Sequence, residues 1–334
     1  MKKYVKLMLS VLFVLLVVAC GKEKEEITVY SCFEEDYIMD YLNDFKQKYP
    51  NIEVNLVRDS SGIISSKFEA EKNNPQADVI WGVATTGFLH NKDYLLPFEY
   101  NVDNIDKKFY DTTGNQPKWV GISSWMTAFT FNKVEGAQKS IEPPLSYEDL
   151  LKDQYSQEVV MPNPASSGTG FLTVSAWIQL LGEEKAWEYM DKLNKNMKMY
   201  VHSGSAPTKM AAQGENLVGI GMGFEGLREK NKGLPVEIIF PKEGSGWEME
   251  IVGIVKKDKV KDGAKKFAEW AISEDAMKLY SKNRGIITDG RITPVLEGYP
   301  KDVNNQMIEN NLQWAAENRD RILKEWERRY GKGE

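Results

Sequence analysis

Residues 163–170 read Asn-Pro-Ala-Ser-Ser-Gly-Thr-Gly and lie between a strand-like run, 158–161, and an apolar helical pattern, 171–181. A short glycine-containing loop between a strand and a helix directs backbone N–H groups and the positive end of the helix dipole at one point. Its hydroxyls add donors, and its glycines let the backbone approach a ligand. Four residues are therefore candidate ligands of a phosphate- or phosphonate-like anion: Ser166, Ser167, Gly168 and Thr169. The alternative is an ordinary helix N-cap whose serines serve only the helix.

A second small polar loop precedes another helical pattern. Residues 202–207 read His-Ser-Gly-Ser-Ala-Pro, and a helix is expected over 208–213. The hydroxyls of Ser203 and Ser205 are expected to reach the same anion from the side. His202 could donate to the anion, bind a metal ion or pack as a neutral loop residue. The sequence thus predicts two serine-rich helix starts that face a shared hollow.

Composition limits the classes of protein that need considering. The chain has 334 residues, of which 42% are hydrophobic, which is enough for a sizeable core and suggests two domains. The formal charge of -6 becomes -6 - 3 = -9 once the three lysines of segment 1–19 are removed. No dense basic stripe is present, so nucleic acid is not an expected partner. The two cysteines, Cys20 and Cys32, are too few for a cysteine-cluster metal site.

The first 20 residues have the features of an export signal. Three lysines precede an apolar run, 7–19, which is too short for a comfortable membrane span. The run ends Val-Val-Ala before Cys20, which resembles the bacterial lipobox. The resemblance implies cleavage of a signal peptide, 1–19, a diacylglycerol on Cys20, and a lipidated tether, 20–26. The protein is then expected in the periplasm or on the outer face of the cell membrane, held there by lipid. The alternative is a plain secretory signal that is cleaved elsewhere.

The mature chain starts with strands and helices in alternation. Strands are expected at 27–31, 52–57 and 78–81, with a helix after each of the first two. This β-α-β-α-β order favours a parallel sheet with helices on both faces, and in such sheets ligands sit beyond the carboxyl ends of the strands. Three small polar loops are expected to converge there: 30–35, 59–62 and 82–86. For any one loop alone, ordinary turn chemistry explains the residues.

Two later runs are expected to cross between lobes: 119–132 and the glycine-rich 218–225. Three helices are expected to close the chain, with the last two over the first lobe: 262–272, 274–282 and 305–330. The expected division is a first lobe, 27–124, a second lobe, 125–224, and a return to the first lobe with the closing helices, 225–334.

An anion that also carries an ammonium group needs carboxylates and an aromatic face around it. The candidate acids are Glu34, Glu35, Asp59, Glu225 and Glu250, and the candidate walls are Tyr30, Trp81 and Thr85. Glu225 and Glu250 are preferred because they lie near or beside expected crossings. For Glu34 and Glu35 the alternative is a solvated surface charge.

Together these stretches resemble the periplasmic solute-binding proteins of ABC importers, in the ferric-iron-binding-like branch, and most of all the 2-aminoethylphosphonate-binding proteins. The resemblance is carried by Tyr30-Ser31 with Glu34-Glu35, 57–60, 78–82, 161–170, 202–205 and 314–319. It implies a two-lobed α/β type II periplasmic binding protein fold, each lobe a mixed sheet flanked by helices, with two chain crossings. It also implies a monomer without a cofactor, which closes on a small organophosphonate like a hinge and delivers it to a membrane permease.

Other functions remain as alternatives. Ferric-binding relatives hold iron with paired tyrosines, a histidine and an acid, whereas here Tyr200 stands alone before Val201 and His202. That departure argues against iron, so no metal is assigned, and ferric iron or another small anion or phosphate ester is kept as the alternative ligand. An enzyme that uses Ser203 with His202 is disfavoured, because adjacent residues rarely place a nucleophile and its base within reach. A structural surface lipoprotein is the third class.

Overall fold

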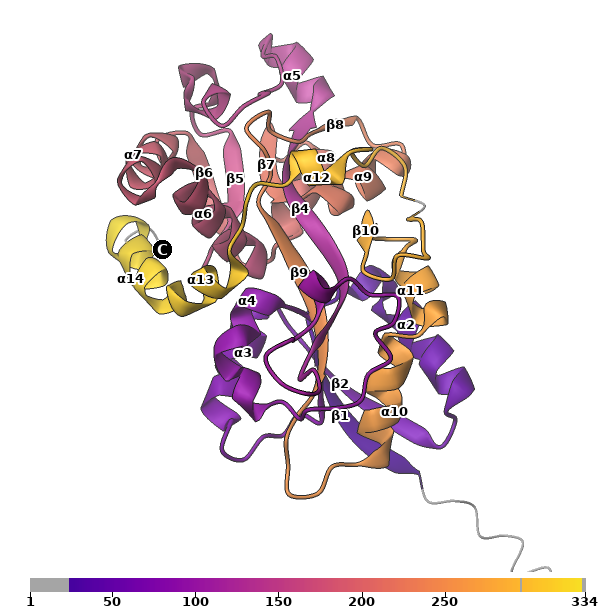
Figure 1. The fold of residues 1–334 in the computed structure, drawn as a ribbon. Coiled ribbons are helices and arrows are strands. Elements are labelled where there is room, and N and C mark those ends of the chain that lie inside the picture. The colour runs from indigo at the N-terminus through magenta and orange to yellow at the C-terminus, as the bar shows by residue number, and fades with distance from the viewer. Residues whose placement is uncertain (1–23, 295, 332–334) are drawn as a thin grey trace, which may run out of the picture.

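A mixed β-sheet runs through the molecule and links two lobes (Figure 1). The computed structural model describes residues 24–294 and 296–331, so the expected signal segment and Cys20 lie outside the described residues. The strands follow the order β2-β1-β3-β9-β4-β7-β5-β6, and β8 and β10 also pair with β4. Within the described residues, no helix is both long and apolar enough to cross a membrane.

The first lobe contains the expected β-α-β-α-β unit. Its strands and helices are β1 (Glu25–Ser31), α2 (Glu35–Lys48), β2 (Ile52–Arg58), α3 (Ser61–Glu71) and β3 (Val79–Ala84). β1 lies between β2 and β3 and is parallel to both, with Val29 opposite Leu56 and Val79. All six residues of β3 are buried, as expected for a strand covered on both faces. The carboxyl ends of these three strands point toward the second lobe (Figure 1).

Two layers of helices cover this part of the sheet. One face carries α2 with α10 (Asp262–Ala271) and α11 (Glu274–Tyr280), joined by an aromatic core in which Phe45 meets Phe267. The other face carries α3 and α4 (Thr85–Phe88), where Phe68 packs on Phe88. The layers hold the loops after β1, β2 and β3 on a rigid base.

One long strand, β4 (Val120–Asn132), belongs to both lobes. Its first half pairs with β9 (Trp247–Ile254), and its second half pairs with β7 (Val218–Met222) and β8 (Val236–Ile239). All thirteen of its residues are buried. This confirms the crossing expected at 119–132.

The return crossing lies later than expected. β7 pairs with β4 and β5 inside the second lobe, the chain turns into a helix at Gly223, and the return is made by β9. The glycines of β7 instead let helix α8 pack closely. A Cβ at Gly219 would lie 2.2 Å from the carbonyl oxygen of Pro207, and one at Gly221 would lie 2.6 Å from Oγ1 of Thr208. Residues 225–239 therefore extend the second lobe.

The second lobe is built on a parallel trio of strands, β6-β5-β7. Its further elements are β5 (Val159–Pro162), α6 (Gly168–Leu181), α7 (Glu183–Leu193), β6 (Met197–Val201), α8 (Ala206–Gln213) and α9 (Gly223–Asn231). The remaining elements are short: η1 (Leu89–Tyr94), η2 (Lys107–Phe109), α5 (Lys133–Lys139), η3 (Asp149–Leu151), η4 (Asp153–Tyr155) and β10 (Ile286–Ile287).

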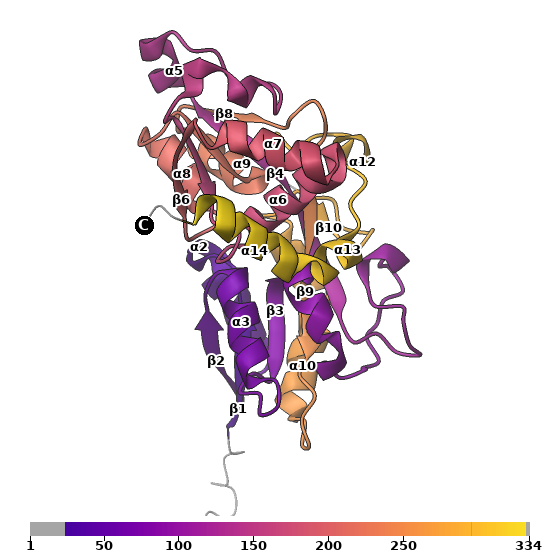
Figure 2. The ribbon, with the colours of Figure 1, turned by 90° about the vertical axis from the view of Figure 1, so that its left-hand side faces the viewer.

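The prediction of one continuous helix over 305–330 is wrong. This segment is broken into α12 (Val303–Gln306), α13 (Leu312–Glu317) and α14 (Arg319–Tyr330), because Asn318 leaves helical geometry between the last two. α14 packs on the second lobe, not the first, through Ile322 and Trp326 (Figure 2). Of the two closing helices that were expected over the first lobe, 274–282 and 305–330, only the first, which is α11, packs there.

Candidate functional site

A small cavity of about 40 Å³ lies where the two lobes meet. A water molecule needs about 10–15 Å³ of such space, so the cavity has room for a small polar group. Its walls come from both lobes and from the two crossing strands: Cys32, Glu34, Ser60, Ser61, Gly82, Ala84, Trp125, Ser167, Gly168, Thr169, Gly204, Met222 and Glu250. The three loops beyond β1, β2 and β3 all contribute, as the strand order predicts.

Helix N-termini converge on this cavity. Five of its wall residues are helix N-caps: Glu34 of α2, Ser60 of α3, Ala84 of α4, Ser167 of α6 and Met222 of α9. A sixth helix, α8, starts beside wall residue Gly204. The first N–H groups of a helix have no partner inside it, and its N-terminus carries about half a positive charge. Among the five caps only Ser167 satisfies its helix with a side chain, accepting from the N–H of Gly170 at 3.3 Å.

The loop 163–170 is also the contact between lobes. The N–H of Gly62 donates to the carbonyl oxygen of Ser166 at 3.1 Å. A Cβ at Gly168 would lie 2.9 Å from Cβ of Ser61 and 3.1 Å from Cβ of Ala84, so the lobes approach this closely only because residue 168 is glycine. Gly168 and Thr169 line the cavity, whereas the hydroxyl of Ser166 donates to the carbonyl oxygen of His202 at 3.0 Å.

The second serine-rich loop lies directly beside the first. A Cβ at Gly204 would lie 2.3 Å from Oγ1 of Thr169. The hydroxyls of Ser203 and Ser205 are 3.1 Å apart and bond each other, so the cavity wall here is the backbone of Gly204. His202 lies outside the cavity, with Nε2 at 3.0 Å from Oδ1 of Asp59 in the other lobe.

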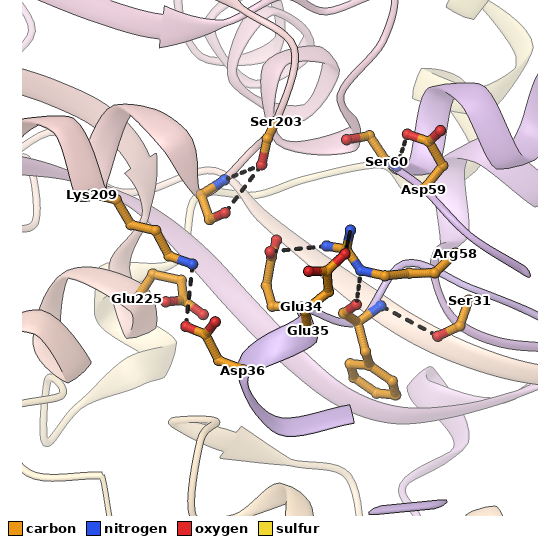
Figure 3. Close-up of polar contacts among 12 residues, drawn as sticks. Ser31, Glu34, Glu35, Asp36, Arg58, Asp59, Ser60, Ser203, Lys209 and Glu225 are labelled. Atoms are coloured by element: carbon orange, nitrogen blue, oxygen red, sulfur yellow. Dashed lines mark hydrogen bonds and ion pairs between the residues drawn. The ribbon is translucent and has the colours of Figure 1, made fainter. Parts of the chain in front are cut away.

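Charged side chains beside the cavity form pairs, and Figure 3 shows Arg58 with Glu34 and Lys209 with Asp36. Arg58 donates to Glu34 at 3.0 Å and to the carbonyl oxygen of Phe33 at 2.7 Å, which holds the start of α2 in place. Burial raises the pKa of the Glu34 carboxyl, and the nearby Glu225 carboxylate adds to the rise while Arg58 opposes it. Glu250 accepts two bonds from Arg284, at 2.8 and 2.7 Å.

Several candidate residues lie away from the cavity. The hydroxyl of Tyr30 donates to Glu71 at 2.8 Å, and the indole N–H of Trp81 donates to Tyr280 at 3.0 Å inside the aromatic core. Thr85 is buried and donates to the carbonyl oxygen of Met249 at 3.0 Å. The side chain of Glu35 is 80% exposed beside Arg58.

Of the candidate acids, Glu34 and Glu250 line the cavity, while Glu225 lies fully buried in the first turn of α9 and accepts from Arg228 at 2.8 Å. Among the residues that lie beside or in the walls without having been singled out in the sequence are Cys32, Ser60, Ser61, Gly82, Ala84, Trp125, Gly204, Met222, Arg58, Arg228 and Arg284. The small polar loops 30–35, 59–62, 82–86 and 202–207 contain six of them. Burial raises the pKa of the Cys32 thiol to about 12.

The described residues provide little for a metal ion. In residues 24–294 and 296–331, no group of three or more histidine, cysteine, aspartate or glutamate side chains is arranged to hold one. Tyr200 donates to Asn194 at 2.7 Å, and its ring packs on Trp326 of α14. The iron alternative therefore gains no support from the tyrosine on which it depended.

Comparisons with known proteins agree with this architecture. Residues 40–309 match the family described as bacterial extracellular solute-binding protein. An uncharacterized protein of Haemophilus influenzae is 32% identical over 240 residues, which cover 70% of this chain and 69% of that protein. A putative 2-aminoethylphosphonate-binding periplasmic protein of Salmonella typhimurium is 22% identical over 287 residues, 82% of each chain.

Solved structures show the same fold. The periplasmic binding protein AfuA from Actinobacillus pleuropneumoniae, with exogenous fructose-6-phosphate bound, has a TM-score of 0.86 and 27% identity, covering 93% of this chain and 100% of its own. Iron-bound HitA from Pseudomonas aeruginosa has a TM-score of 0.75 and 17% identity, covering 90% and 99%, and shows the fold alone. The two-lobed type II fold expected from the sequence is thereby confirmed.

Proposed function

The chain belongs to the family of bacterial extracellular solute-binding proteins, and from that premise we propose that it captures a small organic phosphonate or phosphate monoester. Proteins of this family bind solutes for ABC importers and are not enzymes. The proposal therefore concerns the ligand, its place in the cleft and the anchoring of the protein.

The observation that carries the proposal is the convergence of helix starts on one cavity. Five N-cap residues line its walls, and Gly168 and Gly204 bring the backbone to its surface. Backbone N–H groups and the positive helix ends stabilise an oxyanion and oppose a metal cation. A phosphonate or phosphate group has three acceptor oxygens and up to two negative charges, which suits this surrounding.

The size of the cavity and the similarity to known proteins narrow the choice of ligand. The cavity of about 40 Å³ favours a head group with a short substituent. An organophosphonate such as 2-aminoethylphosphonate is supported by the loop motifs and by the distant Salmonella relative. A phosphate monoester is the second candidate, supported by the likeness to the structure with fructose-6-phosphate.

We also propose that in the cell the protein is a monomer, that a lipid on Cys20 anchors it, and that it delivers its ligand to a permease. The lipobox-like residues before Cys20 support the anchor. Mass spectrometry of the membrane-bound protein should show a diacylglycerol on an N-terminal Cys20. Release of the unmodified Cys20→Ser variant into the medium would agree with it, and an unlipidated N-terminus in the wild-type protein would contradict it.

Calorimetry on the chain without its signal segment tests the ligand. Titration with 2-aminoethylphosphonate, 2-hydroxyethylphosphonate and O-phosphorylethanolamine should give saturable heat for at least one probe, with a matching rise in melting temperature. The sulfonate taurine, which has one negative charge fewer on the same carbon chain as 2-aminoethylphosphonate, is the matched control and should bind more weakly. Absence of binding to every phosphonate and phosphate ester, or tighter binding of ferric citrate, would refute the proposal.

A further inference from the structure

We infer that the ligand's end remote from phosphorus carries no positive charge and offers acceptor oxygens, and that Arg228 of α9 is a residue that determines this specificity. The inference rests on the proposed function, because it concerns the same cavity. It favours a hydroxyl, carbonyl or carboxylate substituent over an ammonium substituent, and so it disfavours 2-aminoethylphosphonate itself among the phosphonates and phosphate esters that the proposed function allows.

Three acids in or near the cavity walls each accept hydrogen bonds from an arginine. Glu34 accepts from Arg58 at 3.0 Å, Glu250 accepts from Arg284 at 2.7 Å, and Glu225 accepts from Arg228 at 2.8 and 3.0 Å. The charges of these three pairs cancel, and Glu35, which also pairs with Arg58 at 3.5 Å, is 80% exposed and therefore screened by water. A ligand ammonium would therefore add a positive charge that no free carboxylate balances, among groups that are largely removed from water.

Two of the cations are fixed by aromatic stacking as well. The guanidinium of Arg228, from the second lobe, lies 4.7 Å from the centre of the Tyr37 ring, and that of Arg284, from the first lobe, lies 5.0 Å from the same ring. Arg284 also lies 4.0 Å from the ring centre of Phe224. Cations held by a ring face and a carboxylate together do not move aside to free an acid for a ligand.

The neighbouring charges do not change this balance. Lys209 pairs with Asp36 at 3.2 Å across the lobes, and Figure 3 shows its ammonium beside Glu225. Glu248 is a buried acid that forms no ion pair with the part of the chain that the structure describes, but it does not line the cavity and accepts bonds from Thr86 and from the N–H of Met249. In the second lobe, Glu225 therefore has two cations beside it, Arg228 and Lys209.

The same cluster holds unused donors. Among the described residues, a terminal nitrogen of Arg284, Nη1, and the hydroxyl of Tyr37 are buried without a hydrogen-bond partner. An arginine nitrogen can only donate, so it is satisfied by an acceptor oxygen and not by an ammonium group. Charge balance and unused donors thus point to the same kind of substituent.

Two pairs of nearly isosteric probes test the inference whichever head group is bound. They are 2-hydroxyethylphosphonate against 2-aminoethylphosphonate, and 2-hydroxyethyl phosphate against O-phosphorylethanolamine. In calorimetry with the wild-type chain, the hydroxyl member should bind about 30-fold more tightly than the amine in the pair that binds. Equal affinities, or tighter binding of the amine, would overturn the inference while leaving the proposed function intact. Failure of all four probes would overturn the proposed function itself, and the inference with it.

Variants of Arg228 and Glu225 test whether their charges, and not a change in structure, set the preference for hydroxyl over amine. Arg228→Gln leaves Glu225 to share Lys209 with Asp36, so the preference for hydroxyl over amine should fall by about tenfold. The double variant Glu225→Gln with Arg228→Gln removes both charges and should restore the preference. The control is Arg321→Gln, which breaks an exposed ion pair between Arg321 of α14 and Glu183 of α7 and should leave the ratio unchanged. A folded Arg228→Gln protein with the wild-type ratio would refute the role of Arg228.

Discussion

Replacing Gly168 with alanine tests whether the approach of the two lobes at this residue controls binding. In the structure, an added Cβ would lie 2.9 Å from Cβ of Ser61 and 3.1 Å from Cβ of Ala84, both in the other lobe. Ordinary carbon–carbon contacts are about 3.5–4.0 Å, so the lobes would have to separate by about half an ångström or more. That movement would also stretch the bond between the N–H of Gly62 and the carbonyl oxygen of Ser166, now 3.1 Å long.

The Gly168→Ala substitution should raise the free energy of the closed state alone. Forcing a methyl group into a packed contact costs about 1–3 kcal/mol, which corresponds to a loss of affinity of roughly 5- to 150-fold. Once the lobes separate, the methyl group has room. Alanine also lowers the entropy of the unfolded chain, so the free energy of unfolding without ligand should stay equal or rise by up to about 1 kcal/mol. Affinity and stability should therefore move in opposite directions.

Calorimetry with the phosphonate and phosphate ester probes measures the affinity, and urea denaturation without ligand measures the stability. Gly114→Ala is the matched control, because a Cβ there would have no neighbour nearer than 3.7 Å. It should change neither quantity by more than about 0.5 kcal/mol. Wild-type affinity in a folded Gly168→Ala protein would refute the idea that closure at this residue is part of binding.

Three further perturbations have defined outcomes. Since removal from water raises the pKa of the half-buried Cys32 thiol to about 12, its reaction with a disulfide reagent at pH 8 should be roughly a thousandfold slower than in the urea-unfolded chain, and equal rates would contradict the raised pKa. Burial raises the pKa of the Glu248 carboxyl to about 7 in the folded chain, so the unfolded chain loses this proton at a lower pH than the folded chain does. The free energy of unfolding should therefore fall by roughly 2–5 kcal/mol as the pH rises from about 4 to above 7. Urea denaturation of Glu248→Gln should lack that part of the pH dependence; an unchanged profile would show that another group causes it. Trp326→Ala, which empties a buried site under α14, should lower the free energy of unfolding by about 3–5 kcal/mol, and a loss below about 1 kcal/mol would mean that α14 contributes little to the second lobe.

The amino-acid sequence alone determined those features that depend on neighbours along the chain. Alternating and helical apolar spacing predicted β1, α2, β2, α3 and β3 and their parallel order. The same reasoning placed the long crossing strand and the polar loops at the carboxyl ends of the first three strands. The two serine-rich helix starts were predicted to lie together, and the structure brings Gly204 against Thr169. These predictions hold because periodicity and strand order are local properties.

The tertiary structure decided which side chains reach the cavity. Alternation along a strand shows that adjacent residues face opposite sides, but not which side is the cleft, so Trp81 was expected in a wall where its neighbour Gly82 lies. Tyr30 was expected there too, but its hydroxyl bonds Glu71, and Cys32, just after the end of β1, lines the cavity instead. The glycines of β7 serve the packing of α8, and the break at Asn318 sends α14 to the second lobe.

The charge pairs depend on the same kind of information. Arg284 meets Glu250 only because β9 and the chain after α11 fold to the same place, a separation of 34 positions in sequence. Gly168 meets Ser61 because two lobes close on each other. Contacts between residues far apart in sequence depend on how whole layers pack, and the local spacing of residues does not predict them.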